Sequence, residues 1–317
     1  MKECVLLHFP SMGGLADELM AEPVMSGGQV RRGSIKWSDF PDGFPNLFIE
    51  NASQLAGKRV VILLSFHDKA TLFEQISVIY TLPRLSVRSL TIVLSYFPTG
   101  TMERVDTIGQ VATAKSLSRM LSSIPSASRG PPHVVIFDIH ALQEQFYFAD
   151  NILPHLLTAT PLLMQEVEKF SDRESVSIAF PDEGAYKRFH RLLPSFPTIT
   201  CMKVREGNQR KVTIVEGEAK GRHVIIVDDL VQSGGTLMEC KNELIARGAG
   251  RVSCFVPHAV FPNGSWKRFA EEEAATRFAN FFVTNSCPEV TSLLQGEPPF
   301  HVLSLAPLIA GFLKHNL

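Results

Sequence analysis

Short apolar segments alternate with helix-length amphipathic segments along most of this chain, and this alternation constrains the fold more than any other feature. The segments with the length and β-branched content of buried strands are 60–65, 90–97, 133–139, 175–180, 198–204, 223–229, 251–258 and 280–285. Helical periodicity occupies 72–82, 111–124 and 236–249. Strands that alternate with helices form parallel sheets covered on both faces. The sequence therefore predicts an α/β fold.

The alternating pattern occurs twice. A proline-bearing connection of small residues, LTATP at 157–161, separates the two halves. A chain of 317 residues with 45% hydrophobic content can bury a core in each of two domains. We therefore expect two stacked α/β domains, residues 1–157 and 158–317. A long charged segment at 205–222 is either a dispensable hairpin or an active-site lid.

The charge balance and the cysteines narrow the class of protein. Acidic and basic residues nearly cancel, 32 against 31, so no uniform basic field is available to hold nucleic acid. The five cysteines are scattered without CxxC spacing, which is typical of reduced thiols and argues against a structural zinc. No segment has the roughly 20 apolar residues of a membrane span. We expect a cytoplasmic protein; the final KHNL is a distant relative of a Ser-Lys-Leu address, so an organelle such as a glycosome, peroxisome or plastid stays open.

A pair of aspartates, Asp228 and Asp229, ends the apolar run HVIIV. At the carboxyl end of a parallel strand they would lie where ligands of open α/β sheets bind. A small-residue loop follows and leads into a helix: Gln232, Ser233, Gly234, Gly235 and Thr236. Glycines allow close backbone approach, and free N–H groups at a helix start attract anions. Carboxylates beside such a loop accept hydroxyl hydrogens, so the stretch predicts a cradle for a phosphorylated pentose; a plain strand-to-helix turn with solvated acids is the alternative.

This loop resembles the one shared by type I phosphoribosyltransferases and ribose-phosphate diphosphokinases, also called phosphoribosyl pyrophosphate synthetases. Along nearly its whole length the chain resembles the synthetases, most of all the plant-type class II enzymes. The segments that carry the resemblance are DGFPNLFIEN (42–51), FEQISVIYTLPRL (73–85), FPTGTMERVD (97–106), DIHALQEQFYF (138–148), FPDEGAYKRFH (180–190) and KVREGNQRK (203–211).

The resemblance implies two tandem phosphoribosyltransferase-like domains, each a mainly parallel sheet flanked by helices. The first would serve the nucleotide, and the second would carry the ribose 5-phosphate loop and a catalytic flexible loop. It also implies the reaction: the β,γ-diphosphoryl group of MgATP passes to the 1-hydroxyl of ribose 5-phosphate, giving 5-phosphoribosyl 1-pyrophosphate and AMP. The implied partners are ATP, ribose 5-phosphate, Mg²⁺ and further copies of the chain in a dimer or larger homo-oligomer, with neither nucleic acid nor membrane.

Two motifs offer metal ligands. Asp138 and His140 lie on one face at the end of the predicted strand 133–139, which suits either a metal or phosphate site or a structural histidine. Asp182 follows the strand 175–180 in a turn. The resemblance places His140 on the Mg²⁺ that bridges the nucleotide phosphates and Asp182 on Mg²⁺ near the reacting centre. Ala185 stands where class I enzymes have a second glycine.

Lys203 and Arg205 occupy alternate positions as the chain leaves the strand 198–204, so their side chains project the same way. From the residues alone, a solvated basic edge and a catalytic pair are equally good interpretations. The resemblance implies that they open the catalytic flexible loop. Phosphoryl transfer needs positive charge around the developing negative oxygens, so we expect both to stabilise the transition state.

The resemblance also implies an ATP site made by Phe40, Asp42, Arg104 and His140. Phe40 would offer a face to adenine and Asp42 an acceptor for its amino group. The glutamate of the class I motif is replaced by Phe44, and Thr101 and Met102 stand where class I enzymes have an arginine–glutamine pair. Arg104 is the candidate to substitute for that pair.

Two other functions remain open at this point. A catalytically silent regulatory paralogue of a synthetase would tolerate the missing arginine–glutamine pair but has no reason to keep Lys203, Arg205, His140 and Asp182. A phosphoribosyltransferase would need a nucleobase hood and would leave the duplicated half unexplained.

Overall fold

The structure, a computed structural model, describes residues 3–25, 30–98, 102–206, 209–273 and 276–316, with backbone only at 203–206 and 209–211. Two compact units form: unit 1 is Met1–Leu157 with Ser304–Leu317, and unit 2 is Thr158–Leu303. The division after Leu157 coincides with the expected one. The expectation that the second domain runs on to residue 317 differs from the structure, because the last helix buries its apolar side on unit 1.

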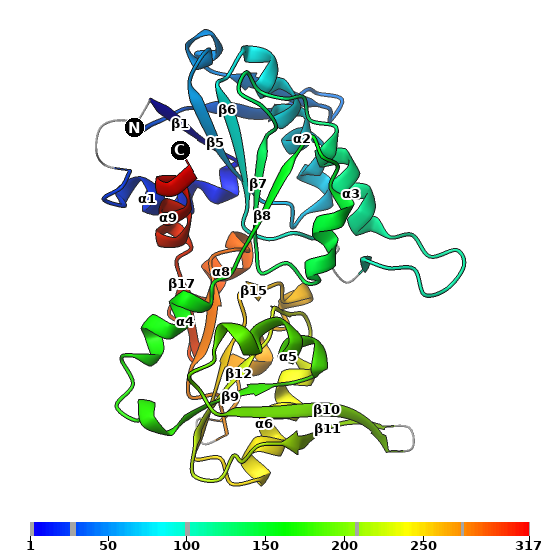
Figure 1. Ribbon diagram of the computed structural model, residues 1–317, viewed down its shortest axis with the longest axis vertical. Coiled ribbons are helices and arrows are strands. Elements are labelled where there is room, and N and C mark those ends of the chain that lie inside the picture. Colours follow the sequence, from blue (N-terminus) through cyan, green and yellow to red (C-terminus); the bar gives the residue numbers. More distant parts are fainter. Residues whose placement is uncertain (1–2, 26–29, 99–101, 207–208, 274–275, 317) are drawn as a thin grey trace. The chain divides into compact units, whose positions relative to one another are not determined.

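Unit 1 is built on a six-stranded parallel sheet in the order β2-β1-β5-β6-β7-β8 (Figure 1). Its strands are β1 (Cys4–His8), β2 (Val30–Arg32), β5 (Arg59–Leu64), β6 (Ser89–Leu94), β7 (His133–Phe137) and β8 (Leu153–Leu157). The central strands are buried on both faces, which is why β5 reads as the continuous apolar run VVILL. An antiparallel hairpin of β3 (Ile35–Asp39) and β4 (Pro45–Ile49) forms a separate small sheet.

The helices of unit 1 are α1 (Gly13–Ala21), α2 (Leu72–Thr81), α3 (Thr113–Ser122) and α9 (Ala306–Asn316), with short 3₁₀ turns η1 (Pro10–Met12), η2 (Ala52–Leu55), η3 (Lys69–Thr71), η4 (Leu82–Leu85) and η6 (Leu142–Tyr147). Helix α9 packs against α1 and buries Ile309, Ala310 and Leu313. These apolar side chains lie on one face of the helix, which fixes the carboxyl-terminal segment to unit 1.

Unit 2 contains a seven-stranded sheet in the order β11-β10-β9-β12-β14-β16-β17, parallel except for the β10–β11 pair. Its strands are β9 (Val176–Phe180), β10 (Thr198–Glu206), β11 (Gln209–Glu216), β12 (His223–Val227), β14 (Arg251–Phe255), β16 (Phe281–Thr284) and β17 (Phe300–Leu303), and β13 (Leu230–Val231) pairs with β15 (His258–Ala259) beside it. The eight predicted strands are thus all present; most end earlier than predicted, whereas β10 continues to Glu206.

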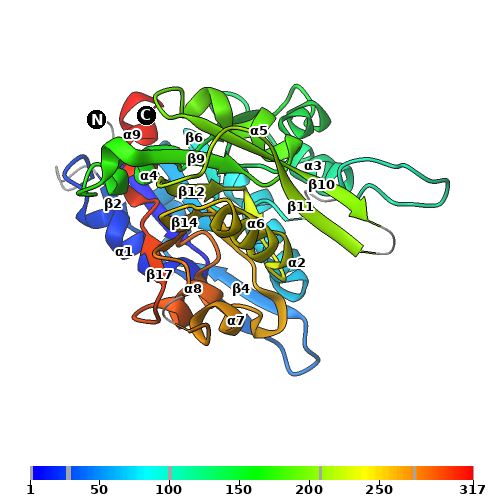
Figure 2. The same cartoon turned by 90° about the horizontal axis from the view of Figure 1, so that it is seen from below.

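The helices of unit 2 are α4 (Thr160–Val167), α5 (Glu183–Phe189), α6 (Gly235–Ala246), α7 (Lys267–Ala270) and α8 (Pro288–Leu294), with η7 (Arg173–Ser175), η8 (His190–Leu192) and η9 (Pro262–Gly264). Helix α6 lies against β11, β12 and β14 (Figure 2). Gly248 follows the end of α6 with φ +82°, the left-handed conformation that commonly ends a helix.

The charged segment at 205–222 is largely β-structure. Strands β10 and β11 pair antiparallel, with Lys203 opposite Val212 and Arg205 opposite Arg210. Figure 1 shows this hairpin projecting from the rest of unit 2. The apolar and β-branched residues VTIV at 212–215 lie within β11.

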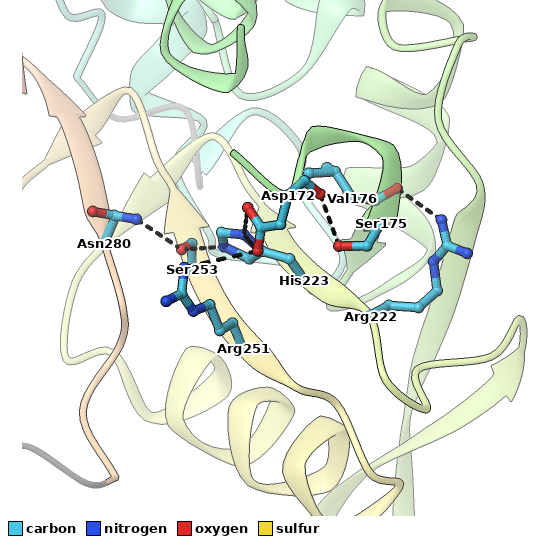
Figure 3. A network of polar contacts seen from close by, with 8 residues as sticks. All are labelled: Asp172, Ser175, Val176, Arg222, His223, Arg251, Ser253 and Asn280. Atoms are coloured by element: carbon cyan, nitrogen blue, oxygen red, sulfur yellow. Dashed lines mark hydrogen bonds and ion pairs between the residues drawn. The ribbon is translucent and has the colours of Figure 1, made fainter. Parts of the chain in front are cut away.

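A polar network closes the amino-terminal end of the unit 2 sheet (Figure 3). Nδ1 of His223 lies 3.1 Å from Oδ2 of Asp172, and its Nε2 lies 2.8 Å from Oγ of Ser253. With the ring neutral, Nδ1–H donates a hydrogen bond to the carboxylate of Asp172, and Nε2 accepts a hydrogen bond from the hydroxyl of Ser253. Ser253 is fully buried, and no substrate can reach its oxygen. This serine–histidine–aspartate arrangement is structural.

Candidate functional site

Three aspartates lie at the carboxyl ends of two neighbouring strands of unit 2. Asp228 and Asp229 follow β12, and Asp182 follows the adjacent strand β9. The backbone N–H of Asp229 donates to Oδ1 of Asp228 at 3.0 Å, and Oδ1 of Asp182 accepts from the N–H of Ala185 at 3.1 Å as the cap of α5. The prediction that the aspartate pair leaves the strand at its carboxyl end is confirmed.

Burial and two neighbouring carboxylates act on the pKa of Asp228. Burial raises the pKa of Asp228 well above its usual range, and the negative charges of Asp229 and Asp182 raise it further. Asp229 is itself 7% exposed. Like charges brought together in a partly buried place favour a proton, a cation or several hydroxyl donors. The cluster is therefore built to receive positive charge or hydrogen-bond donors.

The small-residue loop after the aspartates wraps the start of α6. Gly234 has φ +77° and precedes the first helical residue, so the loop turns at a conformation that glycine adopts without strain. A Cβ at this position would overlap the ring of Phe269. The loop brings Gln232 and Ser233 to the surface beside the free N–H groups of the first helical turn. The structure thus brings together the predicted loop and the aspartate pair.

Two residues that the sequence did not indicate hold this loop from outside. Oγ of Ser265 donates to the carbonyl of Gln232 at 2.8 Å, and Nη1 of Arg268 donates to the carbonyl of Ser233 at 2.8 Å. Both anchors come from the segment around η9 and α7, about thirty residues along the chain. With its carbonyls bonded outward, the loop has its N–H groups left to face a ligand. No local motif marks these anchors, so only the fold reveals them.

In unit 1 the predicted adenine residues lie on the β3–β4 hairpin. Phe40 is exposed at its tip, and Oδ1 of Asp42 accepts from the N–H of Phe44 at 3.1 Å. A hollow of about 470 Å³ opens beside the tip, lined by Asp39, Gly43, Phe44, Pro45, Ala70, Thr71, Phe73 and Glu74. Burial, and then the charge of Asp39, raises the pKa of Glu74. The hollow offers aromatic and carboxylate groups, although Phe40 and Asp42 stand at its margin.

Arg104, the expected substitute for the arginine–glutamine pair, is held by acids of its own loop. Its Nε lies 3.3 Å from Asp106 and 3.8 Å from Glu103. The side chain is exposed, so it can exchange these partners for another anion. Thr101, at the first position of the missing pair, lies outside the described residues.

His140 lies three residues beyond the end of β7 and is exposed. The turn before it contains Asp138, which is fully buried with φ +36°, a conformation that few residues other than glycine adopt. The N–H of Asp138 donates to the carbonyl of Leu157 at 2.9 Å. The chain therefore passes from a buried residue, Asp138, to an exposed one, His140, within this strained turn.

Lys203 and Arg205 lie in the outer half of β10, where the structure describes the backbone but not the side chains. Their alternate positions put them on one face of the hairpin. Their predicted catalytic role stays a prediction.

The described residues contain no group of three or more histidine, cysteine, aspartate and glutamate side chains able to hold a metal ion by themselves. The predicted ligands belong to different units, His140 to unit 1 and Asp182 to unit 2. In the same described ranges, no helix has both the length and the apolar character needed to cross a membrane.

Comparison with known proteins covers both units. Residues 12–124 match the family described as the N-terminal domain of ribose phosphate pyrophosphokinase, and residues 148–273 match the phosphoribosyl transferase domain. The fold is similar to the crystal structure of phosphoribosylpyrophosphate synthetase from Mycobacterium smegmatis, with a TM-score of 0.82 and 23% identity over 99% of both chains. The predicted two-domain architecture is confirmed.

Plant proteins are much more similar in sequence. Ribose-phosphate pyrophosphokinase 4 of Oryza sativa subsp. japonica is 52% identical over 301 residues, which cover 94% of this chain and 93% of that protein. Ribose-phosphate pyrophosphokinase 3, mitochondrial, of Spinacia oleracea is 49% identical over 316 residues, which cover 99% of this chain and 77% of that protein. With both halves matched and the glycine-bearing loop set beside paired aspartates, the chain belongs to the ribose-phosphate pyrophosphokinase family.

Proposed function

We propose that this chain transfers the β,γ-diphosphoryl group of ATP to the 1-hydroxyl of ribose 5-phosphate, releasing AMP. The observation that carries the proposal is the loop 232–236, which starts a helix directly after Asp228 and Asp229 in a chain of this family. One phosphate and a vicinal pair of hydroxyls suit that arrangement.

On the pentose side, the N–H groups of Ser233, Gly234, Gly235 and Thr236 would bind the 5-phosphate at the positive end of α6. Asp228 and Asp229 would accept hydrogen bonds from the ribose hydroxyls. The outward bonds of the loop carbonyls to Ser265 and Arg268 support this assignment, because they orient the loop before the ligand arrives.

On the nucleotide side, Phe40 would stack on adenine and Asp42 would accept from its amino group. Arg104 and His140 would contact the phosphates. The exposure of Phe40 and Arg104 and the neighbouring aromatic hollow support an open nucleotide site on unit 1.

Mg²⁺ prefers oxygen ligands, and the acidic surroundings of Asp182, where the charges of Asp182 and Asp229 raise the pKa of Asp228, support the binding of a cation there. We propose that Asp182 in unit 2 and His140 in unit 1 are each Mg²⁺ ligands. When bound, Mg²⁺ supplies positive charge that offsets the negative charge of the transferred phosphoryl oxygens.

The transfer itself would be an in-line attack of the 1-hydroxyl oxygen on the β-phosphorus, with AMP as the leaving group and no covalent enzyme intermediate. Lys203 and Arg205 would neutralise charge on the transferred group, and their position on the projecting β10–β11 hairpin supports a closing movement that excludes water. Positioning and electrostatics would supply most of the acceleration.

The decisive experiment is to incubate the purified chain with ATP, Mg²⁺ and ribose 5-phosphate and to measure AMP. Release of AMP only when ribose 5-phosphate is present supports the proposal. A silent regulatory paralogue would release none, and would change the rate of an active synthetase instead. A phosphoribosyltransferase would release pyrophosphate from the activated sugar in the presence of a nucleobase.

We also propose that the chain forms a homo-oligomer of two or more copies. Two exposed phenylalanines of unit 1 outside the proposed adenine site, Phe48 and Phe146, support an additional contact surface. Light scattering on a size-exclusion column measures the mass, and a single-chain mass at micromolar concentration contradicts the proposal.

A further inference from the structure

Three arginines gather at the amino-terminal edge of the unit 1 sheet. Arg59 is the first residue of β5, Arg88 directly precedes β6, and Arg129 lies in the turn before β7. The N–H of Arg88 donates to the carbonyl of Lys58 at 2.7 Å, and the N–H of Arg129 donates to the carbonyl of Arg88 at 3.0 Å. These bonds place the three residues side by side. We call them the arginine cluster.

The arginine cluster is separate from the nucleotide site on the same unit. Its members precede parallel strands or begin them, whereas His140 follows the carboxyl end of β7. The two ends of a parallel strand lie at opposite edges of a sheet. A ligand at the cluster would therefore leave the proposed ATP site untouched.

The positive charge of the cluster has no balancing acid among the described residues. None of the three guanidinium groups takes part in an ion pair or donates a side-chain hydrogen bond there, and Nη1 of Arg59 is buried without any hydrogen-bond partner. Glu3, on the neighbouring strand end, is engaged by Lys58, whose hydrogen bond and charge lower the pKa of that carboxyl, with a smaller effect of Arg31. Burying an unpaired cation is costly.

The three charges are close enough to repel one another. Partial burial lowers the pKa of Arg88, and the charges of Arg129 and then Arg59 lower it further. The charge of Arg59 also acts on Cys4 at the start of β1, where it opposes the effect of burial on the thiol pKa. Arg59 and Arg88 are half-buried and Arg129 is exposed, so the cluster is a shallow concentration of charge that solvent can reach.

We propose that the arginine cluster binds a phosphate group, as inorganic phosphate or as the terminal phosphate of a small metabolite. A guanidinium presents paired N–H donors that match the oxygens of phosphate, and a doubly charged anion would offset most of the repulsion among three cations. The small size of the cluster and the near-neutral charge of the chain favour a small anion over nucleic acid.

The test measures thermal unfolding of the full chain without added metal, in sodium phosphate and in sodium chloride of equal ionic strength. The chain should unfold at a higher temperature in phosphate, and the variant Arg59→Gln/Arg88→Gln should lose most of that excess. Phosphate bound at the loop 232–236 contributes equally to both proteins, so the difference isolates the cluster. An equal phosphate-specific rise in both proteins overturns the proposal.

Three further variants complete the experiment. Arg84→Gln removes an exposed arginine of η4 elsewhere on unit 1 and should keep the full phosphate response. If the double variant does not fold, Arg129→Gln in the exposed turn replaces it and should reduce the response. Arg88→Glu supplies a negative charge from within the cluster, so it should raise the unfolding temperature in chloride and abolish the phosphate response. A lower unfolding temperature in chloride together with an intact response would also overturn the proposal.

Glycerol 3-phosphate, tested beside inorganic phosphate, distinguishes the two sources of the ligand. A response to both identifies the phosphate group as the ligand, and a response to inorganic phosphate alone identifies a site for the free anion. Wild-type protein that responds to neither in excess of chloride overturns the proposal. Because none of these measurements is an activity, failure here leaves the AMP-release experiment unaffected.

Discussion

The ring of Phe269 lies directly against Gly234, so the loop 232–236 has no room for a side chain at its turning point. Gly234 also has φ +77°. Two independent constraints, steric contact and backbone conformation, therefore require glycine there.

Gly234→Ala should destabilise the chain by about 3 kcal/mol, the sum of overpacking and left-handed strain, and should raise the KM for ribose 5-phosphate. Gly296→Ala is the matched control, because Gly296 has φ +81° but nothing within 4 Å of its Cβ position. The control should lose about 1 kcal/mol and keep its KM. Urea unfolding and steady-state kinetics measure both, and equal losses in the two variants would contradict the steric argument.

Asp228→Asn should make the chain more stable at neutral pH while impairing activity. An acid whose pKa is raised by folding stabilises the folded state while it keeps its proton. That contribution is complete below its ordinary pKa of 3.8 and is lost as the pH rises through the raised value. Asparagine carries no charge and its Oδ1 still accepts from the N–H of Asp229, so the gain should be about 1 kcal/mol or more at pH 7. Urea unfolding from pH 4 to pH 8 checks this; parallel curves for the two proteins would exclude a raised pKa.

Asp172→Asn should make the chain more sensitive to acid. Burial lowers the pKa of His223, and Asp172 offsets only part of that shift. Because the folded-state pKa is below the ordinary value of 6.5, the neutral ring contributes its full stability above pH 6.5. This stability is lost as the pH falls below 6.5 toward the lowered value. Without the carboxylate the pKa falls further. The variant should lose about 1 to 2 kcal/mol at pH 7.5 and more at pH 5.5.

Urea unfolding at the two pH values tests the Asp172 prediction. The control variant is His315→Gln, which removes an exposed histidine near the end of α9 and should leave the difference between the two pH values unchanged. The same loss for Asp172→Asn at both pH values would show that His223 does not titrate in this range.

Lys203→Ala should reduce turnover by roughly 10³-fold while ribose 5-phosphate affinity stays nearly unchanged, because the lysine would act only on charge that develops during transfer. Lys169→Ala serves as the control, since Lys169 is exposed and pairs with Glu166 on the neighbouring turn. Isothermal titration with ribose 5-phosphate and AMP-release kinetics separate binding from turnover. Near-normal turnover would remove Lys203 from the mechanism.

Local sequence determined the parts of this protein that depend on neighbours along the chain. The eight predicted strands are present because short runs of β-branched and apolar residues favour strands that a sheet buries on both faces. The arrangement of the loop 232–236 was equally predictable, since the aspartates, glycines and helix start are nearly consecutive in the sequence.

Features that depend on distant contacts needed the tertiary structure. The segment 304–317 belongs to unit 1 because the apolar side of α9 is buried on α1, and its sequence alone is compatible with either unit. Ser265 and Arg268 anchor the loop 232–236 through backbone carbonyls, a contact that leaves no trace in residue spacing. The arginine cluster likewise forms only where strand ends 59, 88 and 129 are brought to one edge. Secondary structure follows from periodicity, whereas packing and charge balance follow from which segments the fold makes adjacent.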